Sequence, residues 1–249
     1  MAEGRSEVGD VPHAPRQQVA ARRDFHACEI AIGRQALVLD RDGVLHWPSE
    51  RMLIVADLHL EKGSSRAARC RLLPPYDTAT TLTRLQRTIE RLRPRHVVAL
   101  GDSFHDRGGA GRLAAHDRVS LGQLMQGRTW TWITGNHDPD PPAGIGGEVA
   151  AELDCGGIAL RHVPQPKAGA EIAGHLHPAA KVARRGHVQR RPGFLHDAVR
   201  VLLPAFGAYT GGLNVLDEAY RELVRHDWQV AVVGRSGVYP VARHQLRPD

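Results

Sequence analysis

Four short clusters of histidine, aspartate and asparagine recur along the chain, each directly after a run of apolar residues. The clusters are Asp57-Leu58-His59, Gly101-Asp102-Ser103-Phe104-His105-Asp106, Gly135-Asn136-His137-Asp138 and Gly174-His175-Leu176-His177. Carboxylate, imidazole and amide-oxygen donors without sulfur suit Mn, Fe, Zn or Mg, and the imidazoles argue against Mg alone. Two such ions close together can clamp a phosphoryl group and generate hydroxide near neutral pH. The residue types therefore predict a two-metal site for phosphoester chemistry.

The apolar runs before the clusters predict the elements that must position them. Short buried strands are expected over residues 52–56, 96–100 and 129–134, with helices between them over residues 77–93 and 112–126. Because ligand sites in open α/β sheets lie at the carboxyl ends of strands, the clusters should converge on one edge of the sheet. In Asp-x-His and His-x-His, alternation along an extended segment directs both side chains to one side.

The rest of the chain is predicted to surround this unit. Residues 1–24 are rich in Gly, Pro, Arg, Glu and Ala without periodicity, which predicts a disordered tail. A β-hairpin is expected around Asp40-Arg41-Asp42-Gly43, and a weak helix over residues 216–225. Further short β-like runs cover residues 157–161, 171–173, 199–203, 228–233 and 238–242. We expect an α/β half followed by a strand-rich half within one domain, residues 25–249.

Taken in order, the clusters and His162 resemble the pattern D-x-H, G-D, G-N-H-D/E, H and G-H-x-H of the calcineurin-like metallophosphoesterases. The resemblance implies an α/β (α+β) fold, a β-sandwich flanked by helices with a dimetal site at the C-terminal ends of strands. One metal would then be held by four residues, Asp57, His59, Asp102 and His177. The second would share the bridging Asp102 and be completed by Asn136, His162 and His175. His162 has no motif of its own, so its assignment depends on the surrounding pattern.

The same resemblance implies roles for residues around the metals. His137 would lie beside the phosphate as general acid for the leaving oxygen or as a stabiliser of the transition state. Asp138 would orient His137 or support the site from behind. His105 resembles the histidine of the G-D-x-F-H segment of nucleases in this superfamily, which helps to position the phosphodiester; the alternative is that it caps a turn. Lys62 and Arg107 are the candidate substrate-binding cations.

A narrower resemblance covers about residues 35–216. The segments ADLHLEKG, LPPYDT, LPAFG and YTGGLNV resemble the bacterial ligase-associated DNA damage response metallophosphoesterases (PdeM). This resemblance implies an endonuclease or phosphodiesterase encoded beside an ATP-dependent DNA ligase, a helicase and an exonuclease-like protein, which become candidate functional partners. The oligomeric state is left open, with a homodimer among the options.

Composition and charge narrow the class of protein further. The formal net charge of +6 comes almost entirely from arginine and permits a polyanionic substrate such as DNA. The basic residues around His187, namely Arg184, Arg185, Arg190 and Arg191, form either a nucleic-acid track or a solvated face. Three scattered cysteines indicate neither a disulfide framework nor a thiolate zinc site. No apolar run could span a bilayer and no signal-peptide pattern is present, so a cytoplasmic protein without membrane association is expected.

The leading hypothesis is a metal-dependent phosphodiesterase or endonuclease that cuts DNA in a ligase-associated damage response. A hydroxide bridging two divalent metals would attack phosphorus in line, with Mn²⁺ the first candidate and Zn²⁺, Fe²⁺ or Mg²⁺ the alternatives. A small-molecule phosphatase or nucleotide phosphohydrolase would use the same ligands. A non-catalytic scaffold with this fold is the third hypothesis, and the presence of His137 with every expected ligand argues against it.

Overall fold

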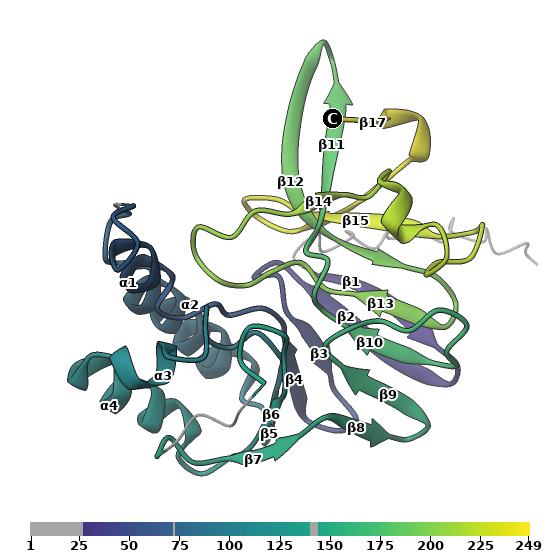
Figure 1. Ribbon diagram of the computed structural model, residues 1–249. Coiled ribbons are helices and arrows are strands. Elements are labelled where there is room, and N and C mark those ends of the chain that lie inside the picture. The colour runs from purple at the N-terminus through teal and green to yellow at the C-terminus, as the bar shows by residue number, and fades with distance from the viewer. Residues whose placement is uncertain (1–26, 72, 140–143) are drawn as a thin grey trace, which may run out of the picture.

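Two β-sheets face each other in the computed structural model, which describes residues 27–71, 73–139 and 144–249 (Figure 1). The tail predicted over residues 1–24 lies outside the described residues. Within them, the first sheet runs in spatial order through β1 (Ala27–Ile32), β2 (Gln35–Asp40), β3 (Leu45–Trp47), β4 (Met52–Val55), β5 (His96–Leu100), β6 (Thr129–Ile133) and β7 (Glu148–Ala150). Strands β4 to β7 are parallel to one another, and β1 to β4 pair antiparallel.

The second sheet contains the strand-rich half of the chain. Its main path runs through β14 (Leu213–Asn214), β11 (Pro178–Arg184), β12 (His187–His196), β13 (Arg200–Leu202), β10 (Glu171–Ala173), β9 (Ile158–Arg161) and β8 (Glu152–Cys155). Three strands pair outside this path, namely β15 (Gln229–Val233), β16 (Val238–Val241) and β17 (Leu246–Arg247). Strands β9, β10 and β13 are parallel, so β9 and β10 end on the same side of the sheet.

Side chains of β4 show why the central strands read as unbroken apolar runs. Met52 and Ile54 point into the layer between the sheets, whereas Leu53 and Val55 point to the opposite face under the helices. A strand buried on both faces has no need of polar alternation. The layer between the sheets also holds residues of the second sheet such as Phe194, which is fully buried. Each large side chain buried in this way contributes about 1.5–3 kcal/mol.

Helices cover the outer face of the first sheet (Figure 1). They are α1 (Lys62–Ala67), α2 (Asp77–Leu92), α3 (Gly109–Arg112) and α4 (Ala115–Met125). Helix α2 buries Leu82, Leu85 and Ile89, whose spacing places them on one helical face. Arg93 ends α2 in the left-handed conformation, just before Pro94. None of the helices among the described residues combines the length and the apolar character needed to cross a membrane.

The predicted β-sandwich with flanking helices is confirmed, and several predicted boundaries are corrected. Strands β5 and β10 have the expected bounds. The helix expected over residues 112–126 is divided between α3 and α4, because Leu113 is extended and buried. The helix expected over residues 216–225 is wrong. Only a 3₁₀ turn, η1 (Glu218–Tyr220), forms there, and the buried Tyr220 hydroxyl donates to the Leu176 carbonyl at 3.1 Å. A second 3₁₀ turn is η2 (Arg243–Gln245).

Candidate metal centre

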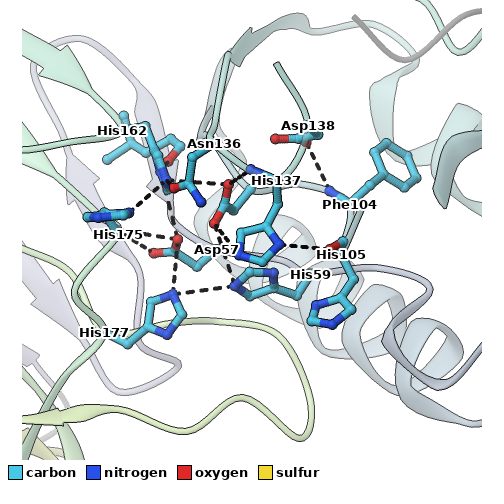
Figure 2. Close-up of polar contacts among 12 residues, drawn as sticks. Asp57, His59, Phe104, His105, Asn136, His137, Asp138, His162, His175 and His177 are labelled. Atoms are coloured by element: carbon cyan, nitrogen blue, oxygen red, sulfur yellow. Dashed lines mark hydrogen bonds and ion pairs between the residues drawn. The ribbon is translucent and has the colours of Figure 1, made fainter. Parts of the chain in front are cut away.

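Five parallel strands from both sheets end at one place, and predicted ligands follow each end. Strands β4, β5 and β6 lead to Asp57, Asp102 and Asn136, and β9 and β10 lead to His162 and His175. Figure 2 shows Asp57, Asn136, His162 and His175 pointing toward one another. The convergence was predicted for one sheet edge. In the structure, the ligands follow the carboxyl ends of strands in both facing sheets, so both sheets contribute to the site.

The first cluster consists of Asp57, His59 and His177, and its donor atoms lie within reach of a single ion. The Nε2 atoms of His59 and His177 are 3.4 Å apart, and Nε2 of His177 lies 3.2 Å from Asp57 Oδ1. Burial, reinforced by the neighbouring His177, lowers the pKa of His59 to about 3. The His59 imidazole is therefore neutral at pH 7, which is the form that binds a metal.

The second cluster consists of Asp102, His162, His175 and Asn136. Nε2 of His162 lies 2.9 Å from Asn136 Oδ1, 3.3 Å from Asp102 Oδ1 and 3.2 Å from Nδ1 of His175. The other ring nitrogen of His162 donates to the Leu100 carbonyl at 2.9 Å. This bond fixes the tautomer and leaves the Nε2 lone pair directed at the cluster, as second-shell bonds to metal-binding histidines do.

Asp102 lies between the two clusters and directs one oxygen toward each. Oδ1 contacts Nε2 of His162 in the second cluster, and Oδ2 is 3.9 Å from Nε2 of His59 in the first. Burial raises the pKa of Asp102, but the hydrogen bond and charge of His162 outweigh it and lower the pKa to about 2. A buried carboxylate that stays ionised between two donor clusters is suited to bridge two cations.

The spacing of the donors fits divalent metal ions. Ligand nitrogens and oxygens lie about 2.0–2.2 Å from zinc, so two donors separated by 90–110° around such an ion are about 2.8–3.6 Å apart. The donor pairs at 3.2 Å (His177 and Asp57), 3.3 Å (His162 and Asp102) and 3.4 Å (His59 and His177) fall in this interval. Burial lowers the pKa of His162, but the neighbouring Asp102 and Asp57 carboxylates outweigh this effect and raise that pKa overall.

Five of the seven predicted ligands have a left-handed backbone. The φ angles are 55° at Asp57, 43° at His59, 45° at Asp102, 72° at His175 and 48° at His177. Each such residue costs on the order of 1–3 kcal/mol, and strained positions of this kind gather at functional sites. Gly174 lets the Asp57 carboxylate approach the backbone closely, because a Cβ at this position would clash with that carboxylate. The surrounding fold thus imposes the ligand positions against local preference.

A pocket of about 500 Å³ opens beside the clusters and is lined by His59, Lys62, His105 and His137. The His137 side chain is 41% exposed. Its Nδ1 donates to the His105 carbonyl at 2.9 Å, so its Nε2 is turned toward Asp102, 3.8 Å from Oδ2. The rings of His105 and His137 stack with centroids 5.5 Å apart. Burial, with a smaller contribution from Lys62, lowers the pKa of His105 to about 4, so its imidazole is neutral at pH 7.

Asp138 contacts the backbone of a neighbouring segment. Its Oδ2 accepts a hydrogen bond from the Phe104 amide at 2.9 Å, and its pKa is raised to about 6 mainly by burial. The bond that orients the His137 ring comes instead from the His105 carbonyl. Whether Asp138 orients His137 or supports the site from behind stays a prediction. Asp138 ties the segment after β6 to the segment after β5, across the bridging Asp102.

Lys62 and Arg107 have different environments. Lys62 begins helix α1, where it is buried and lines the pocket. Its neighbour Glu61 is fixed by Thr78, whose hydroxyl donates to Oε1 at 3.0 Å and accepts from the Glu61 amide at 2.9 Å. The segments EKG and PYDT thus hold Lys62 in place together. Arg107 is exposed, and it is not among the described residues that line the pocket.

Sequence reasoning missed one wall of the pocket. Residues 210–213 line it together with the histidines, although no role was predicted for them. Gly212 packs directly on the His177 carbonyl, so closely that any Cβ would collide with it. The consecutive glycines of YTGGLNV were a visible sign of close backbone contact, but the partner of that contact could not be predicted from local pattern.

Comparisons with known proteins identify what the chain is similar to. The family model for calcineurin-like phosphoesterases matches residues 50–156. A nuclease, MPE, from Pseudomonas putida has a crystal structure that is 30% identical, with a TM-score of 0.69, covering 86% of this chain and all of that one. Protein AQ665 of Aquifex aeolicus is 17% identical over 54% of this chain and 81% of its own, with a TM-score of 0.38. The phosphoesterase Yfce of E. coli is 13% identical over 77% of this chain and 98% of its own, with a TM-score of 0.40. No curated protein gives a significant match.

The chain belongs to the calcineurin-like phosphoesterase family. It is accordingly a hydrolase that acts on phosphate esters, as predicted. The family implies divalent metals, and the two donor clusters joined by Asp102 are the groups that would hold them.

Proposed function

We propose that the protein is a metal-dependent phosphodiesterase that cleaves DNA strands internally. The observation that carries the proposal is the convergence of both donor clusters beside an open pocket lined by His137 and His105. The likeness to a nuclease of 30% identity supports the choice of a phosphodiester over other phosphate esters. The mixed imidazole, carboxylate and amide donors favour Mn²⁺, with Zn²⁺, Fe²⁺ and Mg²⁺ as alternatives.

Each side chain around the pocket has its own role in ester cleavage. When bound, two divalent ions supply Lewis-acid polarisation of the phosphate and a nucleophilic hydroxide near neutral pH. His137 keeps Nδ1–H on the His105 carbonyl, so when protonated its Nε2 delivers a proton to the leaving sugar oxygen. The neutral His105 ring, stacked on His137, positions the phosphodiester. Lys62 contributes a cation at the same pocket.

Hydrolysis of bis-p-nitrophenyl phosphate and of DNA oligonucleotides tests the proposal. We expect activity that is lost with a chelator and restored by Mn²⁺. His137→Ala should lower kcat about 10²–10⁴-fold, the usual contribution of a general acid. His116→Ala is the matched control, because His116 is an exposed histidine on α4. An unchanged kcat in His137→Ala would contradict the assigned proton donor.

A phosphatase of small molecules is the alternative that the same donors allow. It would hydrolyse p-nitrophenyl phosphate much faster than the bis-ester and leave every DNA substrate intact. The diester proposal would then be wrong, while the metal centre would stand.

The biological setting is a further part of the proposal and has its basis in the sequence resemblance. The expected setting is DNA repair alongside an ATP-dependent DNA ligase, a helicase and an exonuclease-like protein. Co-purification of these proteins with the tagged chain after DNA damage, and the mass of the purified protein in solution for a homodimer, test these associations.

A further inference from the structure

The hairpin formed by β11 and β12 extends beyond the body of the two sheets (Figure 1). Residues 178–192 contain five cations and neither aspartate nor glutamate. The cations are Lys181, Arg184, Arg185, Arg190 and Arg191. The formal net charge of the whole chain is only +6, so one short hairpin concentrates a charge nearly as large as that total. A concentration of this size demands an explanation beyond solubility.

Strand register places three of the cations of this region in a row. Lys181 on β11 is paired with Arg190 on β12 and with Arg247 on β17. Directly paired residues point to the same face of a sheet, with Cβ atoms about 4.5–5.5 Å apart, and like charges at such positions are destabilising. We call Arg190, Lys181 and Arg247 the cationic row. Asp249 pairs with Arg190 at one end and offsets one of the three charges.

The cationic row begins at the rim of the catalytic pocket. Arg190 donates to the Gly212 carbonyl at 2.6 Å, and Gly212 lines the pocket and packs on His177 of the first cluster. Strand β11 itself starts at the residue after His177. Lys181 is four positions beyond His177, which is about 13 Å along an extended strand. A ligand that contacts both the first cluster and Lys181 must therefore carry negative charge along a length greater than that of one phosphodiester.

We propose that the cationic row binds the sugar–phosphate backbone of a nucleic-acid strand whose scissile phosphodiester lies at the metal clusters. This inference rests on the proposed function and assigns the surface that binds the strand outside the metal clusters. Phosphate anions between Arg190, Lys181 and Arg247 would relieve the mutual repulsion that the register creates. Binding of this kind depends on charge, so it is independent of base sequence and weakens with salt.

The test compares charge removal in the row with charge removal elsewhere. The double variant Lys181→Gln/Arg247→Gln keeps long side chains but loses two charges. The control is Arg34→Gln/Arg87→Gln, two exposed arginines on the β1–β2 turn and on α2. Fluorescence anisotropy with a labelled single-stranded oligonucleotide, in chelator so that no cleavage occurs, gives the affinity of each full-length chain as a function of salt.

For single strands, the slope of log affinity against log salt is about 0.7 per phosphate neutralised. Two lost contacts should therefore reduce the slope by about 1.4. Over a fourfold rise in salt, the parent chain should lose roughly sevenfold more affinity than the Lys181/Arg247 variant. The control should keep the parent slope. With metal restored, the ratio of kcat/KM for the oligonucleotide to that for bis-p-nitrophenyl phosphate should fall in the row variant.

Equal salt slopes in all three proteins would overturn the inference. So would a parent chain that binds anionic lipid vesicles but no oligonucleotide. Failure of the proposed function has a different signature, because it would remove hydrolysis of the small diester while leaving the difference in slope. Thermal melting of each variant shows whether the proteins compared are equally folded.

Discussion

The left-handed backbone at His175 leads to a prediction about stability. At this position a chain with glycine should be more stable than one with alanine, which is the reverse of the usual order. His175 has φ of 72°, and its amide donates to Asp57 Oδ2 at 3.0 Å. A residue with a Cβ costs roughly 1–2 kcal/mol in this conformation, whereas glycine adopts it freely. Glycine normally destabilises a folded chain by about 0.5–1 kcal/mol relative to alanine, because it loses more backbone entropy. At His175 the first effect should exceed the second.

The experiment compares His175→Gly with His175→Ala, both of which remove the imidazole. Subtracting the entropy cost from the strain leaves glycine more stable by up to about 1.5 kcal/mol, with a central value of roughly 0.75 kcal/mol. For a chain of this size, 1 kcal/mol corresponds to about 2–4 °C in Tm. Thermal unfolding in chelator measures the difference without a contribution from bound metal. His175 is only partly buried, so loss of packing enters both variants alike.

A second pair of variants tests the reasoning on an unstrained backbone. Gln86 is exposed in the middle of α2, where alanine should be more stable than glycine by about 1 kcal/mol. If alanine were equally stable or better at both positions, the claim of strain at the ligand would be refuted. The opposite order at the two positions would show that the fold stores strain in the metal centre.

Two further predictions concern groups that hold the site in place. Asp138→Ala leaves the Phe104 amide without its acceptor and should cost about 1–3 kcal/mol by urea unfolding, whereas Asp138→Asn keeps an acceptor oxygen and should cost much less; equal losses would show that this bond is unimportant. Glu171→Ala leaves Arg200, which is buried and paired with Glu171, without a counter-charge, and Arg161 loses the same partner. It should cost about 3–5 kcal/mol, and a Tm within a degree or two of the parent would contradict the assigned pair.

Local motifs explain how much of the centre could be predicted from the sequence. Asp57 and Asp102 follow apolar runs that are buried on both faces, so the strand and the position after its end were both visible. The G-N-H-D and G-H-x-H motifs carried their own spacing. His162 had no motif, and its placement beside Asn136 comes from tertiary structure alone.

Other features depend on contacts between distant segments and had no local sign. The tip of the hairpin of β11 and β12, residues 184–192, is mostly polar and exposed, so it lacks the apolar alternation that marks a half-buried strand. The 3₁₀ turn at Glu218–Tyr220 replaces a longer helix because Tyr220 is anchored by the segment around Leu176. Arg107 was predicted to bind substrate, but it is exposed on a turn that faces solvent.

The origin of the ligands in two sheets has a consequence for the order of events during synthesis. His59 and His177 are 118 positions apart, so a chain growing from its N-terminus completes the first cluster only after β10 has been made. An ion held by that cluster ties the ends of a loop whose closure costs roughly 4 kcal/mol in chain entropy. Metal loading is therefore expected late in folding, and a partly synthesised chain has no assembled centre with which to attack phosphodiesters in the cell.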